Sequence, residues 1–225
     1  MTVEYCVISI GALSHNRLWG EPAPLRTPHA TTTLVKDGGR RILVDPGLPP
    51  TVMEARFNER TGGHVTDVTD VFCTTLRMAH RRAIAALPGA RWWCGEAELQ
   101  WYRERLGDLI SSAGRLKGED LSAAQADLAL LKRFHPAPDR FGPQTELFPL
   151  QGPSPGCTGL LLTPATHSIV IAGDAALTTE HVQRGQVWEG SEDAEAALES
   201  LRSILEIADV IVPGHDNVLL ARGAW

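Results

Sequence analysis

Carboxylate and imidazole side chains stand directly after several apolar runs that we expect to form β-strands. Asp45 opens an Asp-Pro-Gly turn after one such run, and His80 lies a few residues after another. Asp174 and His215 occupy comparable positions in the second half of the chain. Because the loops at strand ends gather at one edge of a layered fold, we expect these four side chains to converge there. Such groups could bind a metal ion or transfer protons.

Sequence motifs for other chemistries give little support to alternative functions. No GxGxxG follows a strand and no GxxxxGK[ST] phosphate loop is present, which argues against dinucleotide-dependent oxidoreductases and nucleotide-binding proteins. We also expect no serine nucleophile of the GxSxG type. The four cysteines form no CxxC pair or zinc-knuckle spacing, so we expect buried free thiols.

The elements that must position these residues alternate between strands and helices, which predicts a layered α/β fold. The turn Asp37-Gly38-Gly39 separates two β-rich runs and predicts a hairpin. A strand at 70–74 is expected to lead into a helix from His80 to Leu87. Residues 96–135 are rich in Ala, Leu, Glu and Arg, which predicts a helical insertion that could act as a lid or form a homodimer face.

Four turns together resemble the metallo-β-lactamase superfamily in their order and approximate spacing. They are Asp45-Pro46-Gly47, the junction from Thr74 to His80, Ala172-Gly173-Asp174-Ala175 and Val212-Pro213-Gly214-His215. The resemblance covers most of the chain. It implies a four-layer αββα sandwich in which residues 1–225 form a single domain, with the helical insertion at about 96–135 inside it.

The family's T-H-x-H-x-D-H motif is only partly present. At this junction Thr75 and Arg77 stand where the family has its first two histidines, Ala79 replaces the aspartate, and only His80 is retained. Pro153 replaces the histidine of the family's G-H-S-P-G turn. The resemblance therefore implies that the first metal position of the family has lost its three imidazole ligands.

The resemblance leaves candidates for the second metal position at His80, Asp174 and His215. Two histidines and one carboxylate can hold a single zinc, iron or manganese ion with open positions. In the alternative, no metal binds, because the permanent charge of Arg77 could pair with Asp174 and disfavour a cation. The sequence leaves both interpretations open.

Other residues are expected around this pocket without binding a metal. The resemblance implies that Asp45 orients the Thr74–His80 loop by accepting hydrogen bonds, while Thr75 and Arg77 face the pocket. His29 and His181 could line its rim, although a structural hydrogen bond is the simpler role for each.

The function implied by the resemblance is that of a divergent hydrolase with at most one metal. Its substrate would be a small ester, lactone, thioester or phosphoester, and Asp174 would be a metal ligand and a candidate proton acceptor. The missing imidazoles predict that it is not an efficient β-lactamase. The alternative is a metal-free pseudoenzyme that binds a small molecule or acts as an interaction module.

Composition limits the partners and the compartment that we expect. The formal net charge of -6 disfavours nucleic acid and anionic lipid as partners. The N-terminus has no basic leader, and no apolar run approaches the length of a membrane helix. We therefore expect a cytoplasmic protein that acts on a small molecule, without nucleic-acid or membrane partners.

Overall fold

Two mixed β-sheets packed face to face form the centre of the molecule in the computed structural model, which describes residues 2–112 and 117–221. The first sheet has the order β1 (Glu4–Ser9), β2 (Thr32–Asp37), β3 (Arg40–Val44), β4 (Asp70–Cys73), β5 (Arg91–Cys94) and β6 (Phe134–Pro136). The second has the order β12 (Leu219–Leu220), β11 (Val210–Pro213), β10 (Ile169–Gly173), β9 (Thr158–Leu162), β8 (Thr145–Pro149) and β7 (Arg140–Gly142).

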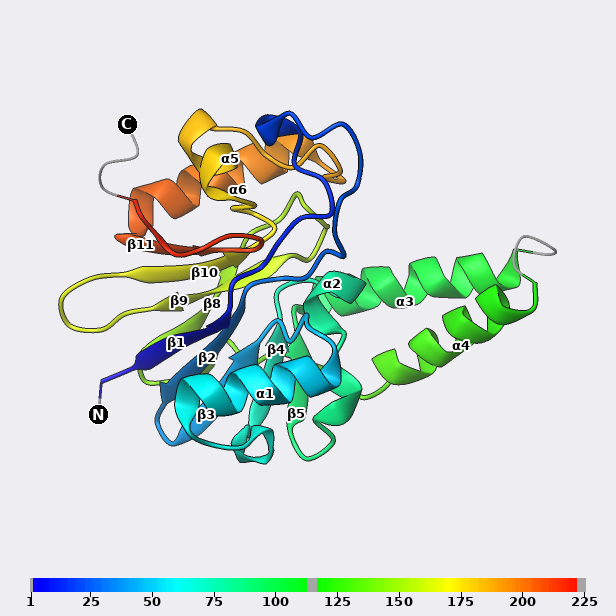
Figure 1. The fold of residues 1–225 in the computed structure, drawn as a ribbon, viewed down its shortest axis with the longest axis horizontal. Coiled ribbons are helices and arrows are strands. Elements are labelled where there is room, and N and C mark those ends of the chain that lie inside the picture. Colours follow the sequence, from blue (N-terminus) through cyan, green and yellow to red (C-terminus); the bar gives the residue numbers. More distant parts are fainter. Residues whose placement is uncertain (1, 113–116, 222–225) are drawn as a thin grey trace.

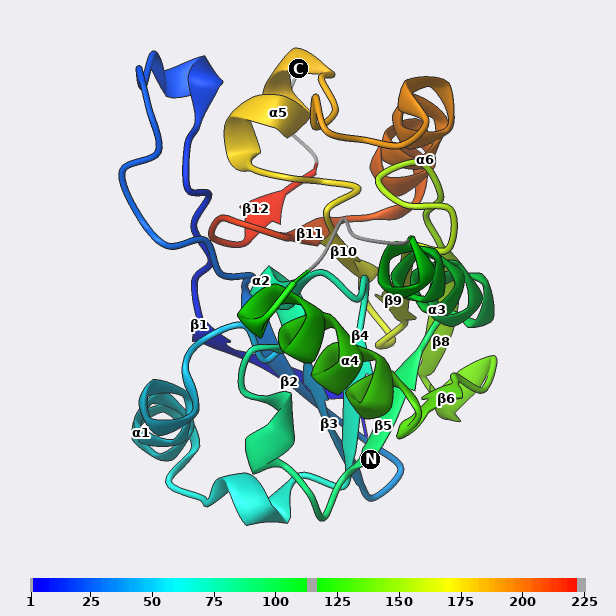
Figure 2. The ribbon, with the colours of Figure 1, turned by 90° about the vertical axis from the view of Figure 1, so that its right-hand side faces the viewer.

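Helices cover the outer face of each sheet, as Figure 1 shows. The first sheet is flanked by α1 (Pro50–Thr61), the short α2 (Met78–Arg81), and the antiparallel pair α3 (Glu96–Ser111) and α4 (Glu119–Leu131). The second is flanked by α5 (Thr179–Arg184) and α6 (Ala194–Ile207). Three short 3-10 helices lie at Arg17–Trp19, Val65–Asp67 and Ile84–Ala86. This is the αββα sandwich that the sequence predicts. Helices α3 and α4 extend away from it as a pair in Figure 1, and Figure 2 views the pair from its far end.

Alternating side chains of each strand enter different parts of the core. In β4, Val71 packs on the helix-covered face whereas Phe72 lies between the two sheets, as expected when successive side chains point to opposite faces. Helix α1 buries Met53 and Phe57 against the first sheet. Helix α6 buries Leu201 among others against the second, so both sheets are buried on both faces.

Parallel pairing places the ends of the important strands together. In the first sheet β3 pairs with β4 in parallel, and in the second β10 pairs with β11 in parallel. The carboxyl ends of parallel neighbours lie at the same edge of a sheet, so the loops that follow them start side by side. The turn after β3, the β4–α2 junction, and the turns after β10 and β11 are therefore brought to the candidate site.

Two of the expected helices differ from the structure. The helix expected from His80 to Leu87 is divided into α2 and the 3-10 turn Ile84–Ala86. A continuous helix would join the Ala83 amide to the Ala79 carbonyl, but Ala83 donates to Pro46 and Ala79 accepts from Ala30. These long-range hydrogen bonds replace the helical ones and tie the junction to the neighbouring turns.

The segment expected to be helical over 96–135 ends earlier than its composition indicates. Helix α4 stops at Leu131, and Phe134–Pro136 forms strand β6, which pairs in parallel with β5. The predicted turn at Asp37-Gly38-Gly39 is confirmed, because β2 and β3 pair up to Asp37 and Arg40 across it. Within the described ranges, no helix has both the length and the apolar character needed to cross a membrane.

Candidate metal centre

Asp45 ties the loop after β4 to the turn after β3. Its carboxylate accepts hydrogen bonds from the Thr74 backbone N–H at 2.8 Å and from the Thr74 hydroxyl at 2.7 Å. The same carboxylate lies 3.0 Å from Nδ1 of His80. Asp45 has a φ of 51°, an uncommon conformation for a residue other than glycine, so the surrounding hydrogen bonds must offset its backbone strain.

His80 is fully buried between two carboxylates. Its Nδ1 faces Asp45, and its Nε2 lies 3.1 Å from Oδ1 of Asp174. Burial disfavours the charged imidazole, but Asp174 and Asp45 outweigh this effect and raise the pKa of His80 to about 10. In the metal-free protein His80 is therefore protonated at neutral pH.

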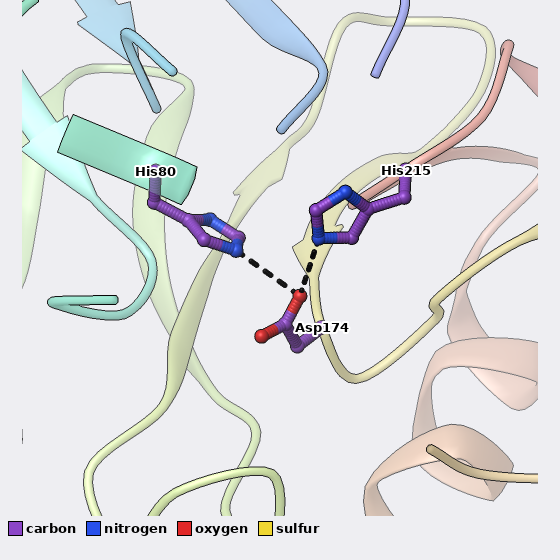
Figure 3. A group of neighbouring side chains, drawn as sticks. All are labelled: His80, Asp174 and His215. Carbon is purple, nitrogen blue, oxygen red and sulfur yellow. Dashed lines mark hydrogen bonds and ion pairs between the residues drawn. The ribbon is translucent and has the colours of Figure 1, made fainter. Parts of the chain in front are cut away.

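His215 reaches the same carboxylate from the second sheet, as Figure 3 shows. Its Nε2 lies 3.2 Å from Oδ1 of Asp174, and its Nδ1 lies 3.0 Å from the carbonyl oxygen of His29 and 3.2 Å from that of Ala12. A carbonyl oxygen only accepts hydrogen bonds, so Nδ1 of His215 must carry a proton. The remaining nitrogen of the ring then faces Asp174.

Asp174 is shared between the two imidazoles and Arg77. Its Oδ1 faces both histidines, while its Oδ2 accepts a hydrogen bond of 2.8 Å from the Arg77 guanidinium. Burial opposes ionisation, but His80 and His215 outweigh it and hold the pKa of Asp174 well below its ordinary value. This carboxylate therefore stays ionised, which suits a metal ligand better than a proton acceptor.

Arg77 is fixed by three different contacts. Besides Asp174, its guanidinium donates a hydrogen bond of 2.6 Å to the Pro153 carbonyl and stacks 4.2 Å from the centre of the Trp188 ring. Arginine suits this position because its planar group can hydrogen-bond at its edge while its face contacts an aromatic ring. A fixed positive charge thus lies directly beside Asp174.

The geometry fits one metal ion. One ligand atom each from His80, Asp174 and His215 can be chosen so that all three lie within 4.8 Å of one another, and all three residues are buried. Both imidazoles present Nε2 to the centre, with Nδ1 occupied by an acceptor, as is usual for metal-bound histidine. At the Arg77 side the guanidinium already bonds Oδ2 of Asp174, and its charge would repel a second cation there.

The remaining residues expected at the pocket have varied positions. Thr75 is buried and donates its hydroxyl hydrogen to Glu98 instead of facing Asp174. The His29 ring contacts the carbonyl oxygens of Ile10 and Thr27, so only its backbone carbonyl reaches the site, through His215. His181 hydrogen-bonds Thr178 at the start of α5 and lines a neighbouring cavity.

Glu98 supports the site but has no motif that marks it. This fully buried carboxylate on α3 accepts hydrogen bonds from the Thr75 hydroxyl at 2.6 Å, the Leu76 amide at 2.9 Å and the Ser154 hydroxyl at 2.6 Å. It therefore joins the β4–α2 junction to the Pro153 loop. Its only sequence signal is an acidic residue in the first turn of a helix, which by itself indicates a favourable helix start.

Ser154 corrects one expectation from the sequence. Residues 152–156 read Gly-Pro-Ser-Pro-Gly and do have the GxSxG spacing. The Ser154 hydroxyl is nevertheless buried and donates to Glu98, and the segment lies before β9 instead of between a strand and a helix. The match is therefore not a nucleophile elbow.

Cysteine chemistry is absent from the site. All four cysteines are free, and Cys73, Cys94 and Cys157 are buried while Cys6 is partly exposed. Burial raises the pKa of Cys73 and of Cys157 well above the ordinary value, which keeps both thiols protonated and unreactive.

The αββα sandwich with a His–Asp–His cluster at the strand ends places the chain among metallohydrolase-type folds. The model of the metallo-beta-lactamase superfamily matches residues 26–215. The chain therefore belongs to the metallo-beta-lactamase superfamily. A comparison with curated protein sequences found no match.

Solved structures share this fold at low sequence identity. A Thermotoga maritima protein with a provisional metallo-beta-lactamase description is 16% identical, with a TM-score of 0.71, 98% of this chain covered and 100% of that one. A quorum-quenching N-acyl homoserine lactone hydrolase is 18% identical, with a TM-score of 0.67, and the match covers 96% of this chain and 93% of that one. AidC, a dizinc quorum-quenching lactonase, is 16% identical, with a TM-score of 0.64, and the match covers 91% of this chain and 80% of that one.

Proposed function

We propose that the protein is a hydrolase with a single metal ion that acts on a small ester, lactone, thioester or phosphoester. The observation that supports it is the convergence of ligand atoms from His80, Asp174 and His215 within 4.8 Å of one another. Two of the structurally similar proteins are lactone hydrolases, which supports lactones as one member of this set. The identity of the metal is left open among zinc, iron and manganese.

The protein's own groups would prepare this site before a metal binds. Asp45 and the His29 carbonyl keep the two Nδ1 atoms engaged, so each Nε2 can lose its proton and become a ligand. Arg77 holds Oδ2 of Asp174 and leaves Oδ1 for the metal. When bound, the metal would polarise the electrophile and lower the pKa of a bound water molecule.

Arg77 also gives the proposed site a second positive charge close to the reacting centre. Its guanidinium cannot be deprotonated in a protein, and its stacking on Trp188 limits its movement. We propose that this charge stabilises negative charge that develops on the substrate. Asp174 would act as a metal ligand and not as the proton acceptor.

A metal-free binding protein is the second candidate, and the Arg77–Asp174 ion pair favours it. With His80 protonated, Arg77 and His80 already place two positive charges beside Asp174 and Asp45 without a metal. Replacing the His80 proton by a divalent cation would add one more positive charge to this buried site. In this case the pocket would bind a small molecule without hydrolysing it.

Metal-dependent hydrolysis separates the two candidates. The protein is treated with EDTA, reloaded with zinc, manganese or iron(II), and assayed on 4-nitrophenyl butyrate, a γ-lactone, an acyl thioester and bis(4-nitrophenyl) phosphate. We expect turnover of at least one substrate after reloading, with none in His215→Ala and normal turnover in His167→Ala, an exposed histidine outside the site. Equal background rates in all three proteins would reject the hydrolase and leave the metal-free candidate.

A further inference from the structure

A cavity of about 560 Å³ lies beside the metal centre, between the segment 13–18, helix α5 and the start of α6. Two of its lining residues adjoin His215: the Leu177 carbonyl accepts the His215 backbone N–H at 2.9 Å, and Leu13 follows Ala12, whose carbonyl faces Nδ1 of His215. Its volume is in the range of small-molecule sites. These contacts place the cavity next to the His215 side of the metal centre.

Trp188 forms the wall that the cavity shares with the site. Its ring lines the cavity and also stacks on the Arg77 guanidinium, which bonds Asp174. Leu18 and Leu198 line the cavity as well, so much of its surface is apolar. A ligand group in this cavity would contact the ring that positions the site's fixed cation.

His181 supplies a hydrogen-bonding group to this apolar wall. Its Nδ1 lies 2.8 Å from the Thr178 hydroxyl, which donates its own hydrogen to the Glu180 carboxylate at 3.0 Å. Because the hydroxyl hydrogen is already used, the Thr178 oxygen must accept a hydrogen bond from Nδ1–H of His181. Nε2 then carries a lone pair, and it has no hydrogen-bond partner in the part of the chain that the structure describes.

Neutral His181 fits this arrangement. Burial, which outweighs the opposing effect of Glu180, lowers the pKa of His181 below its ordinary value. At neutral pH the ring thus offers Nε2 as an acceptor and not as a cation.

Charges at the mouth of the cavity favour an uncharged ligand. Arg17 and Glu189 both line it and form an exposed ion pair at 3.1 Å. Glu195 also lines it, so the wall offers no excess positive charge that would bind an anionic group. The cavity thus combines apolar walls with neutral polar groups that include His181, and it offers no excess positive charge.

We propose that this cavity binds the part of the substrate remote from the reacting bond: an uncharged, largely apolar group that carries an N–H or O–H donor to Nε2 of His181. This rests on the proposed hydrolase function and narrows it to substrates such as N-acylated or hydroxylated esters and lactones. The cavity, Trp188 and His181 select the substrate, whereas His80, Asp174 and His215 form the reacting centre.

Two matched amides test the proposal without any turnover. N-Methylhexanamide has an N–H donor, and N,N-dimethylhexanamide has none but is slightly more apolar. Both are titrated into the protein as purified and after EDTA treatment, and the ¹H–¹⁵N signal of the Trp188 indole, assigned by its loss in Trp188→Phe, reports binding. We expect the monomethyl amide to bind about three- to tenfold more tightly, as the loss of one hydrogen bond implies. This ratio should fall to about one in His181→Phe and persist in His167→Phe.

Each outcome bears on the proposal directly. Equal affinities in the wild type, a ratio that survives in His181→Phe, or no binding up to the solubility limit would overturn it. If His181→Phe fails to fold, the ratio of the two amide affinities in the wild type and the long-range ¹H–¹⁵N spectrum of the His181 ring still test the proposal. A protonated Nε2 in that spectrum would contradict the acceptor role. Since the titration needs no metal, selectivity without metal-dependent hydrolysis would retain the cavity site and reject the hydrolase.

Discussion

Replacing Glu98 should strongly destabilise the protein, although no sequence motif marks this residue. Its carboxylate accepts three hydrogen bonds in a fully buried position, from Thr75, Leu76 and Ser154. A buried donor left without a partner costs about 1–3 kcal/mol. We therefore expect Glu98→Ala to lower the free energy of unfolding by about 3–5 kcal/mol.

Glu98→Gln separates the loss of charge from the loss of contact. The amide keeps the volume and one acceptor oxygen, but its NH₂ group must face either Ser154 or the Thr75 and Leu76 donors. We expect a loss of about 1–3 kcal/mol, since hydrogen bonds to a charged group are stronger than neutral ones. Urea denaturation measures both variants, with Glu104→Gln as the control on the exposed side of α3, expected within about 0.5 kcal/mol of wild type. A Glu98→Ala loss below about 1 kcal/mol would refute the argument.

Three further changes have defined outcomes. The pKa of His181 is lowered in the fold, so its neutral form contributes stability that is present above pH 6.5 and is lost on acidification. Below pH 6.5 the wild type should therefore lose more free energy of unfolding than His181→Phe, as measured by urea titrations at each pH. Asp127→Ala removes the two hydrogen bonds of 2.6 and 2.7 Å between Arg81 and Asp127, and it should lower the free energy of unfolding by about 2–4 kcal/mol in the same assay. A loss of less than about 0.5 kcal/mol, as for an ordinary surface substitution, would contradict this prediction. Gly173 has a φ of 55°, and in Gly173→Ala the added Cβ would lie against the Thr74 hydroxyl. The substitution should lower the free energy of unfolding by at least about 2 kcal/mol and therefore lower Tm, whereas an unchanged Tm would contradict the clash.

The family and the αββα fold could be predicted from the sequence because their signals are local. Asp45, Asp174 and His215 each follow a strand of apolar residues, and the order of these turns identifies the superfamily. Parallel pairing of neighbouring strands then brings the turns to one edge. The local sequence pattern thus predicts where in the fold the candidate site lies.

The contacts within the site could not be predicted, because they join distant residues. Glu98 lies 23 residues from Thr75, in a helix whose composition indicates only an insertion. Trp188 meets Arg77 across the two halves of the chain. The His29 contribution comes from its backbone carbonyl, and no pattern of side chains encodes such a contact.

The most direct test of the one-metal account is the metal content of wild type, His215→Ala and Arg77→His after loading with zinc and removal of excess metal. The account predicts about one zinc per wild-type chain. It predicts an affinity reduced by at least about 100-fold in His215→Ala, since even changes to residues behind the ligands cost 10–100-fold. Arg77→His should bind zinc more tightly, because a neutral imidazole replaces the cation beside Asp174. Two zinc ions per wild-type chain, or none in any of the three proteins, would contradict the account.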